Sequence, residues 1–284
     1  MPDKIAGGYS ATVKKRSLGR LLIRLREEAG FKFTDACKRT GLSTTTLASM
    51  EKATWVTPNS DHVRVLLDLY GVKGRPREQI LQIAFEARER GWWRAKRYLG
   101  VFANELPGYE EGAAQINTYA NVVLPGILQS PTYVDIVTRS AGIEESDEVA
   151  RHREARTERQ RVLTRSKAPV ALHAVIDENA VVRIADEARQ EQIAQLLEMS
   201  DRRNVTIQVV PASAGVYPGS GEPFIHMEFA QAEFSDLIYL ETSIDDRFLE
   251  EEDEVEAFKA RFRWLVDAAL DPDATRAFLR QQGK

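Results

Sequence analysis

Residues 41–52 are the stretch of the sequence whose side chains are best suited to contact a partner molecule. Ser43 is a good N-cap for a helix, because its hydroxyl can accept hydrogen bonds from the free amides of the first turn. On that helix Leu47 and Met50 share one face and are predicted to point into a small core. The opposite face carries short polar or basic side chains and no acid: Ser43, Thr44, Thr45, Ser49 and Lys52.

A face of this kind can enter the major groove of double-stranded DNA and form hydrogen bonds to base edges. Its N-terminal amides can meanwhile point at a phosphate. We therefore interpret residues 41–52 as the recognition helix of a helix-turn-helix, with the five polar residues above as the DNA-binding set. The alternative is a threonine-rich surface helix in an unrelated bundle, and the flanking sequence has to decide between the two.

No group of residues has the spacing of a catalytic site. The glycine-containing stretch 211–223 lacks the lysine and the strand–helix frame of a phosphate-binding loop. A Gly-x-Ser-x-Gly nucleophile elbow is missing as well. The four histidines are scattered, and Cys37 is the only cysteine, which excludes an intramolecular disulfide and a cysteine-rich metal site. We expect a protein that is not an enzyme and that uses no metal or cofactor.

Charge is distributed unevenly along the 284 residues, although the net charge is only −4. Residues 1–75 contain 14 Lys and Arg against 7 Asp and Glu, whereas the remaining residues contain 25 against 36. A basic N-terminal module on an acidic body is typical of a DNA-binding domain joined to a partner-binding or sensory domain.

The N-terminal third predicts a compact all-α domain. Residues 1–16 are basic and contain glycine, which predicts a flexible arm, and Ser17 is expected to cap the first helix. Leu18, Leu21, Leu22 and Leu25 then follow the spacing of one apolar helix face. Residues 17–75 are predicted to form the helix-turn-helix domain. A helix that begins with Pro76 at its first position leads into a linker over residues 76–104.

Residues 17–72 resemble the XRE (Cro and phage-repressor-like) helix-turn-helix family. The matching positions are Leu25-Arg26, Gly30, Gly41-Leu42-Ser43, Leu47, Met50-Glu51 and Leu66-Leu69-Tyr70. The resemblance implies an ion pair between Arg26 and Glu51 and base reading by Thr44, Thr45 and Ser49. The sequence departs from the family at Phe33, Ala36 and Ala53, where a glutamine, a large aliphatic residue and a glycine are usual.

Residues 105–284 predict an α+β domain. Alternating or continuous apolar runs indicate strands over 170–176, 205–210, 224–229 and 237–242. Helices are predicted over 147–165, 187–200 and 248–265 and from Pro272 onward, which gives a mostly antiparallel sheet covered by helices. The first of these helices is rich in arginine and glutamate, which favours an exposed, salt-bridged helix.

This second part resembles the large C-terminal domain, of unknown biochemical function, that follows an XRE domain in many actinobacterial regulators described as antitoxin-like. Gly91-Trp92-Trp93 and residues 124–133 carry most of the match, which continues through residues 172–178, 204–211 and 236–242. The resemblance implies a transcriptional regulator whose C-terminal domain binds a small protein that is often encoded by a neighbouring gene.

The leading hypothesis is a sequence-specific DNA-binding regulator, a homodimer with a small protein partner for which the loop 211–223 becomes ordered on contact. No apolar run reaches membrane-spanning length and the N-terminus lacks a signal-peptide core, so we expect a cytoplasmic protein without membrane contact. The alternative is a ligand-sensing regulator with a small-molecule pocket in the C-terminal domain, lined by Tyr217, Phe224 and Phe229.

Overall fold

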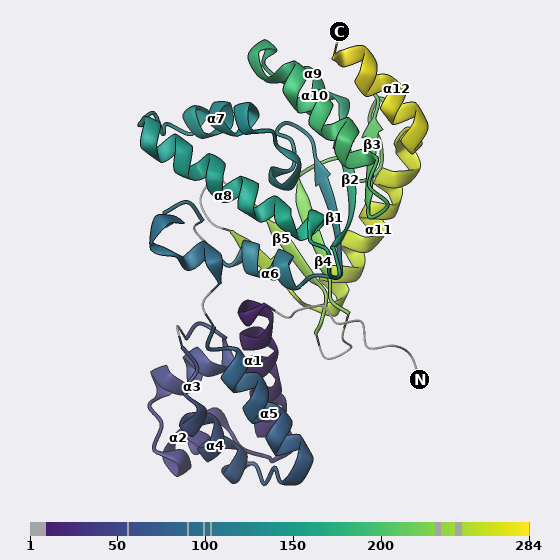
Figure 1. Ribbon diagram of the computed structural model, residues 1–284. Helices are drawn as coiled ribbons and strands as arrows, with labels where there is room; N and C mark the ends of the chain where they lie inside the picture. The colour runs from purple at the N-terminus through teal and green to yellow at the C-terminus, as the bar shows by residue number, and fades with distance from the viewer. Residues whose placement is uncertain are drawn as a thin grey trace. The chain divides into compact units, whose positions relative to one another are not determined.

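The computed structural model describes residues 10–55, 57–89, 91–98, 100–102, 104–230, 234–241 and 246–283 (Figure 1). The chain divides into two compact units, of which one spans Gly8–Ala95 and the other includes Lys96–Lys284. Residues 1–9 of the expected basic arm lie outside the described residues, as does Thr242 at the end of the strand expected over 237–242.

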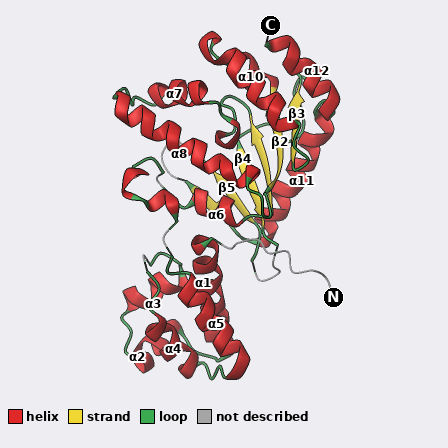
Figure 2. Ribbon diagram, in the orientation of Figure 1, coloured by secondary structure: helices red, strands yellow, loops and turns green. Residues whose placement is uncertain are grey.

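The N-terminal unit is entirely helical in its described part (Figure 2). Its helices are α1 (Ala11–Glu28), α2 (Phe33–Thr40), α3 (Thr44–Glu51), α4 (Ser60–Leu69), α5 (Gly74–Glu86) and the short 3-10 turn η1 (Trp92–Arg94). The first helix starts earlier than the sequence suggested. The Ser10 hydroxyl caps it by accepting a hydrogen bond from the Val13 amide, and no residue between Ser10 and Ser17 breaks a helix. Ser17 is buried inside α1, so its prediction as a cap was wrong, as was a flexible arm over residues 10–16.

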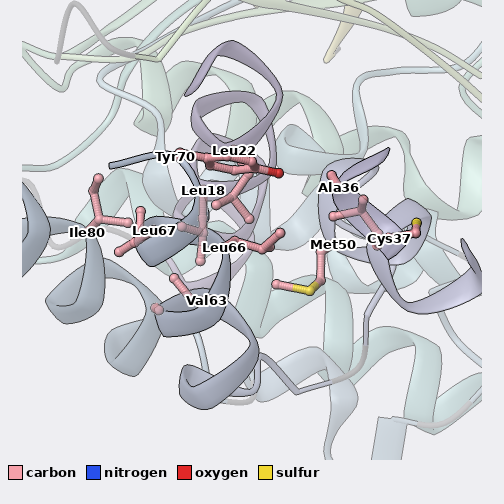
Figure 3. Packing of buried hydrophobic residues seen from close by; sticks show 12 residues of the cluster. Leu18, Leu22, Ala36, Cys37, Met50, Val63, Leu66, Leu67, Tyr70 and Ile80 are labelled. Atoms are coloured by element: carbon pink, nitrogen blue, oxygen red, sulfur yellow. The ribbon is translucent and has the colours of Figure 1, made fainter. Parts of the chain in front are cut away.

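One hydrophobic core joins the helices of this unit (Figure 3). Leu18 and Leu22 of α1 meet Leu66 and Leu67 of α4 in its centre, and all four are fully buried. Ile80 and Ala84 bring α5 into the same core. The helix that was expected to connect two domains is therefore an integral helix of the N-terminal bundle.

The end of α3 contains a residue in an unfavourable backbone conformation. Ala53 has a φ of 55°, in the left-handed region where glycine is the usual residue. Its amide is bonded to the Met50 carbonyl, and the Thr54 amide is bonded to the Ser49 carbonyl, as in a Schellman motif. This alanine occupies the position at which the XRE family usually has glycine, so the departure noted in the sequence carries a conformational cost.

Ala53→Gly should therefore stabilise the end of α3. Relief of the left-handed strain contributes about 1–2 kcal/mol, and the greater freedom of glycine in the unfolded chain removes about 0.5–1 kcal/mol of it. Hydrogen exchange of the Leu47 and Met50 amides in the full chain should become slower. Ala29→Gly is the matched control, since Ala29 ends α1 with a φ of −79° and gains nothing from glycine. Faster exchange in Ala53→Gly would contradict the strain argument.

The C-terminal unit combines a six-stranded sheet with helices on both of its faces. Its strands are β1 (Gln115–Ala120), β2 (Ala171–Asp177), β3 (Val205–Val210), β4 (Phe224–Glu228), β5 (Leu237–Leu240) and β6 (Arg247–Leu249). Its α-helices are α6 (Leu106–Gly112), α7 (Pro131–Ser140), α8 (Ser146–Thr164), α9 (Glu178–Val182), α10 (Asp186–Ser200), α11 (Glu252–Ala268) and α12 (Pro272–Gln282). Three 3-10 turns complete it: η2 (Lys96–Tyr98), η3 (Gly126–Leu128) and η4 (Ala212–Ala214).

The sheet is mixed, with the strand order β3-β2-β1-β4-β5-β6. The pairings of β1 with β2 and of β2 with β3 are parallel, and the three remaining pairings are antiparallel. The predicted fold class, an all-α helix-turn-helix bundle followed by an α+β domain with a mostly antiparallel sheet, is confirmed. Residue 248 lies in β6 instead of in a helix, because α11 begins only at Glu252, within the acidic run that follows β6.

Helices cover the two faces of this sheet differently. Tyr119 and Phe224 lie on the face that packs against Phe262 of α11. Tyr239 points to the opposite face, because neighbouring residues of a strand alternate and Ile238 belongs to the α11 core. Figure 1 shows α8 on the side of the sheet opposite α11. The arginine-rich helix therefore has one side against the domain and one side toward solvent.

Candidate functional site

The turn before α3 has the geometry that its residue types favour. Gly41 adopts a left-handed φ of 73° at the end of α2. The Ser43 side chain accepts a hydrogen bond from the Thr46 amide at 3.0 Å and lies 2.8 Å from the Thr46 hydroxyl. Ser43 therefore caps α3 and leaves the other first-turn amides available to an anion.

The structure places the sequence-predicted polar residues on one helix and its two caps, but with unequal exposure. Thr44 and Thr45 are exposed in the first turn, and Lys52 is exposed at the C-cap. Ser49 is only partly exposed, and its hydroxyl donates to the Thr46 carbonyl at 2.8 Å. Ser49 can therefore still accept a hydrogen bond from a base, whereas donating one would require it to leave the Thr46 carbonyl.

The orientation of α3 depends on a close approach to α1 at Gly19, which the sequence analysis missed. A Cβ atom on Gly19 would lie 2.6 Å from the Glu51 carbonyl oxygen and 2.9 Å from that of Met50. Both are backbone atoms, so no side-chain rotation could relieve the overlap. A glycine within a leucine-rich helix is the only sequence signal of this contact, and it does not reveal which helix lies opposite.

An ion pair between the same two helices adds to this contact. Arg26 donates through Nε to Glu51 Oε1 at 2.7 Å and through Nη2 to Oε2 at 3.2 Å, and through Nη1 to the Phe31 carbonyl at 3.2 Å. The hydrogen bond to Glu51 is the main cause of the raised pKa of Arg26. Burial, together with the Glu51 charge, raises the pKa of Tyr70 to about 12. The pair keeps both charges in a largely desolvated place, where a bidentate geometry is strongest.

The two ends of α2 differ in what they offer to a DNA phosphate. Phe33, where the XRE resemblance led us to expect glutamine, packs partly buried against the core. Lys38 and Arg39 are exposed in the last turn of α2, and Arg39 lies 5.4 Å from the centre of the Phe31 ring. Lys38 and Arg39 therefore add positive charge close to α3, and neither belongs to the DNA-binding set predicted from the sequence.

Gly19→Ala should displace α3 and weaken binding to DNA. Alanine is intrinsically better than glycine within a helix by about 1 kcal/mol, so any loss reports the overlap with the α3 carbonyls. We expect a net destabilisation of about 1–3 kcal/mol, as for an overpacked core, and a lower thermal midpoint. Arg24→Ala, on the exposed side of α1, is the matched control. Equal behaviour of the two variants would show that the α1–α3 distance adjusts freely.

The C-terminal unit contains a second, more deeply buried ion pair. Arg159 of α8 donates through Nε and Nη2 to the two carboxylate oxygens of Glu110 in α6, at 2.5 and 2.6 Å. The side chains are 8% and 1% exposed. Burial disfavours the charged form of Arg159, but the Glu110 carboxylate outweighs it and the pKa of Arg159 is raised.

Arg156 lies one turn earlier on α8 and is bound differently. Its Nη1 donates to the Gln129 side chain at 3.2 Å. A Cβ on Gly126 would lie 2.7 Å from Arg156 Nη1 and 3.0 Å from Arg159 Nη1, so both guanidinium groups lie against the backbone of the η3 turn. The prediction of a wholly exposed, salt-bridged helix over 147–165 was wrong on this side, because α8 packs on η3 and α6; Arg151 and Arg161 on the outer side are exposed, as predicted.

The aromatic residues expected to line a ligand pocket belong to the core instead. Tyr217 and Phe224 are buried in the cluster under α11, and Phe229 is buried as well. The Tyr217 hydroxyl donates to Asp177 and lies 2.6 Å from that of Tyr119.

The loop over 211–223 is attached to the domain at several points. Asn121 donates to the Gly221 carbonyl at 2.6 Å, and Arg261 donates to those of Gly219 and Glu222. These bonds hold the second half of the loop against the domain, and ordering of the loop by a partner stays a prediction.

The histidines on the sheet are held by hydrogen bonds. His173 Nε2 lies 2.7 Å from Gln208 Oε1, and His226 lies between Asn117 and Asp236. Within the described ranges, His, Cys, Asp and Glu side chains form no group of three that could hold a metal ion. Among the helices of the described chain, none combines the length and apolar composition needed to cross a bilayer.

Comparison with known protein families agrees with the division of the chain into two units. A helix-turn-helix domain model matches residues 17–80, and a model described as a domain of unknown function (DUF5753) matches residues 103–281. The second match covers more than half of the chain. The protein belongs to the DUF5753 family. No curated protein and no solved structure matches the chain. A helix-turn-helix followed by a DUF5753 domain supports a DNA-binding regulator, and the comparisons add no evidence of catalysis.

Proposed function

We propose that this protein is a sequence-specific DNA-binding transcriptional regulator of the XRE type. The observation that carries the proposal is the acid-free N-terminal face of α3, which is exposed while buried contacts fix the helix from behind. In this proposal α3 enters the major groove, Thr44 and Thr45 contact base edges, and the first-turn amides that Ser43 leaves free face a phosphate. Ser49 accepts a hydrogen bond from the DNA, and Lys52 contributes charge.

The proposed regulator acts as a homodimer in the cytoplasm. A single helix-turn-helix covers few base pairs, and such domains normally read two half-sites about one helical turn apart. We propose that the C-terminal domain provides the dimer contact, because it has the larger surface, and that the protein is antitoxin-like, with a small partner protein encoded by a neighbouring gene.

Replacing Thr44, Thr45 and Ser49 by alanine should relax sequence preference and leave phosphate binding largely intact. Loss of one good base contact costs about 1–3 kcal/mol of discrimination, so selection from random duplexes should return a degenerate site for the triple variant. Affinity for unrelated DNA should change little, because the basic residues are unchanged.

Thr157→Ala is the matched control, since Thr157 is an exposed helical threonine of α8. If the triple variant selected the same sequences as the wild type, the assignment of α3 as the recognition helix would be lost.

We place a surface for the proposed protein partner where two loops and the helix α9 of the C-terminal domain are hydrogen-bonded together. The Asn121 side chain donates to the Gly221 carbonyl, and the Asn179 side chain donates to the Asn121 carbonyl at 3.1 Å. The segments joined in this way carry four exposed valines: Val122, Val123, Val182 and Val216. Val216 is 97% exposed although its neighbour Tyr217 is buried. Exposed aliphatic side chains next to fixed polar groups are typical of interaction sites.

Val216→Asp should therefore weaken the complex with the small protein encoded by the adjacent gene. An aspartate at a contact that excludes water loses its hydration without a partner, and we expect the dissociation constant of the co-expressed, purified pair to rise by at least about tenfold. Ala150→Asp, an exposed position on α8, is the control. If both variants bind as the wild type does, the valine surface is not the partner site; if the wild type forms no complex, the partner proposal itself fails.

The second candidate function is sensing of a small molecule by the C-terminal domain. The aromatic pocket expected from the sequence is filled by its own side chains. The specific observation in favour of this function is the position of Arg156, whose guanidinium group lies against the η3 turn and donates only to a neutral amide among the described residues.

A further inference from the structure

Arg156 differs from Arg153, Arg159 and Arg161 of α8 in having no carboxylate partner among the described residues. Arg153 donates to Asp135 at 2.8 Å, Arg161 to Glu158 at 2.8 Å, and Arg159 to both oxygens of Glu110. The only hydrogen bond of Arg156 to a described residue uses Nη1 and a neutral amide, Gln129. Its Nε and Nη2, which form the fork that binds carboxylates and phosphates, make no such bond.

The charge of Arg156 is poorly compensated. Burial, together with the neighbouring charge of Arg159, lowers the pKa of Arg156 to about 10. The Glu110 carboxylate is already bound by Nε and Nη2 of Arg159. Glu241 attracts Arg156 without forming an ion pair with it. An underpaired charge of this kind costs stability, so a protein that keeps one usually uses it.

The surroundings of Arg156 are rigid on the side of the η3 turn. Gln129 donates through its amide to the Leu124 carbonyl at 2.8 Å, which fixes the oxygen that receives Arg156. Gln160 and Gln195 donate to the Gln129 carbonyl at 2.6 and 2.8 Å. Since Gly126 has no side chain, the guanidinium group rests against the turn itself. The position of the Arg156 fork is therefore set before any ligand arrives.

The fork is not fully buried. Arg156 is partly exposed, and neither Nε nor Nη2 belongs to the buried side-chain atoms that lack a hydrogen bond in the described part of the chain. The edge that Gln129 leaves unbonded therefore keeps some contact with solvent.

We propose that Arg156 is an oxyanion-binding residue that receives the carboxylate or phosphate group of a small effector through Nε and Nη2. The ligand neutralises a charge that the chain itself leaves underpaired. This site goes beyond DNA binding and beyond the valine surface, because it uses none of their residues.

The competing explanation is structural: Glu241, although not in contact, serves as the counter-ion of Arg156. The two explanations predict opposite effects on the ligand-free protein. Removal of a structural cation destabilises the fold, whereas removal of an unsatisfied one leaves the stability unchanged or raises it.

The test compares the full-length wild type with Arg156→Gln, and with Arg151→Gln as a control on the exposed side of α8. Thermal midpoints are measured in chloride, inorganic phosphate and acetate at matched ionic strength, and binding of the two oxyanions is measured by calorimetry. We expect Arg156→Gln to melt no lower than the wild type in chloride. We also expect it to lose the extra stabilisation by phosphate or acetate, with affinity for the effective anion at least about tenfold weaker. Arg151→Gln should retain both properties.

The pair of anions separates a phosphate-bearing from a carboxylate-bearing effector, since the preferred group gives the larger shift. Glu241→Gln completes the design, because removal of a competing carboxylate should tighten anion binding. The proposal is overturned if Arg156→Gln and Arg151→Gln respond alike to the anions. It is also overturned if Arg156→Gln and Glu241→Gln each lower the chloride midpoint and their double variant lowers it no further.

Discussion

A bidentate arginine–glutamate pair joins two helices in each unit of the chain, and the arrangement of both units depends on it. Arg26 and Glu51 are 25 residues apart, and Glu110 and Arg159 are 49 apart, so each pair connects helices that the chain does not bring together by itself. Breaking such a pair by removing one partner typically costs about 3–5 kcal/mol, because the remaining charge stays desolvated. These pairs specify which helices meet, and the surrounding apolar cores provide the driving force.

In the N-terminal unit this constraint acts on the helix that is proposed to read DNA. Gly19 allows α1 to approach the carbonyl end of α3, and the ion pair to Glu51 holds that same end. The opposite end of α3, with Thr44 and Thr45, is left exposed. A recognition helix has to present its side chains at a fixed angle, and here both fixing contacts lie at the end of α3 opposite to Thr44 and Thr45. Ala53, strained directly after this end, marks the place where the chain leaves the helix.

The N-terminal bundle was largely predictable because its signals are local. Caps such as Ser43, left-handed glycines such as Gly41 and apolar residues three or four apart act within one turn of a helix. The C-terminal sheet was less predictable, since the parallel pairing of β1 with β2 brings together residues far apart in the sequence. Polar residues such as Asn117 on a buried strand hide the strand pattern, and the strands predicted from the sequence do not include β1.

The charge cluster on α8 shows a limit of a different kind. Arg151, Arg156, Arg159 and Arg161 are equivalent in the sequence, where their spacing indicates only a salt-bridged helix. Their environments diverge because α8 packs against η3 and α6, which buries Arg159 with a carboxylate and brings Arg156 against a glycine and an amide. Arg159 and Arg156 are the same residue type, and they differ only in what they contact. Arg159 is a structural cation because it contacts a carboxylate, whereas Arg156 contacts an amide and has unused donors. The desolvation of Arg156 is offset by one bond to a neutral amide, whereas that of Arg159 is offset by a bidentate carboxylate. The anion proposed for Arg156 would supply the charge that Glu110 supplies to Arg159.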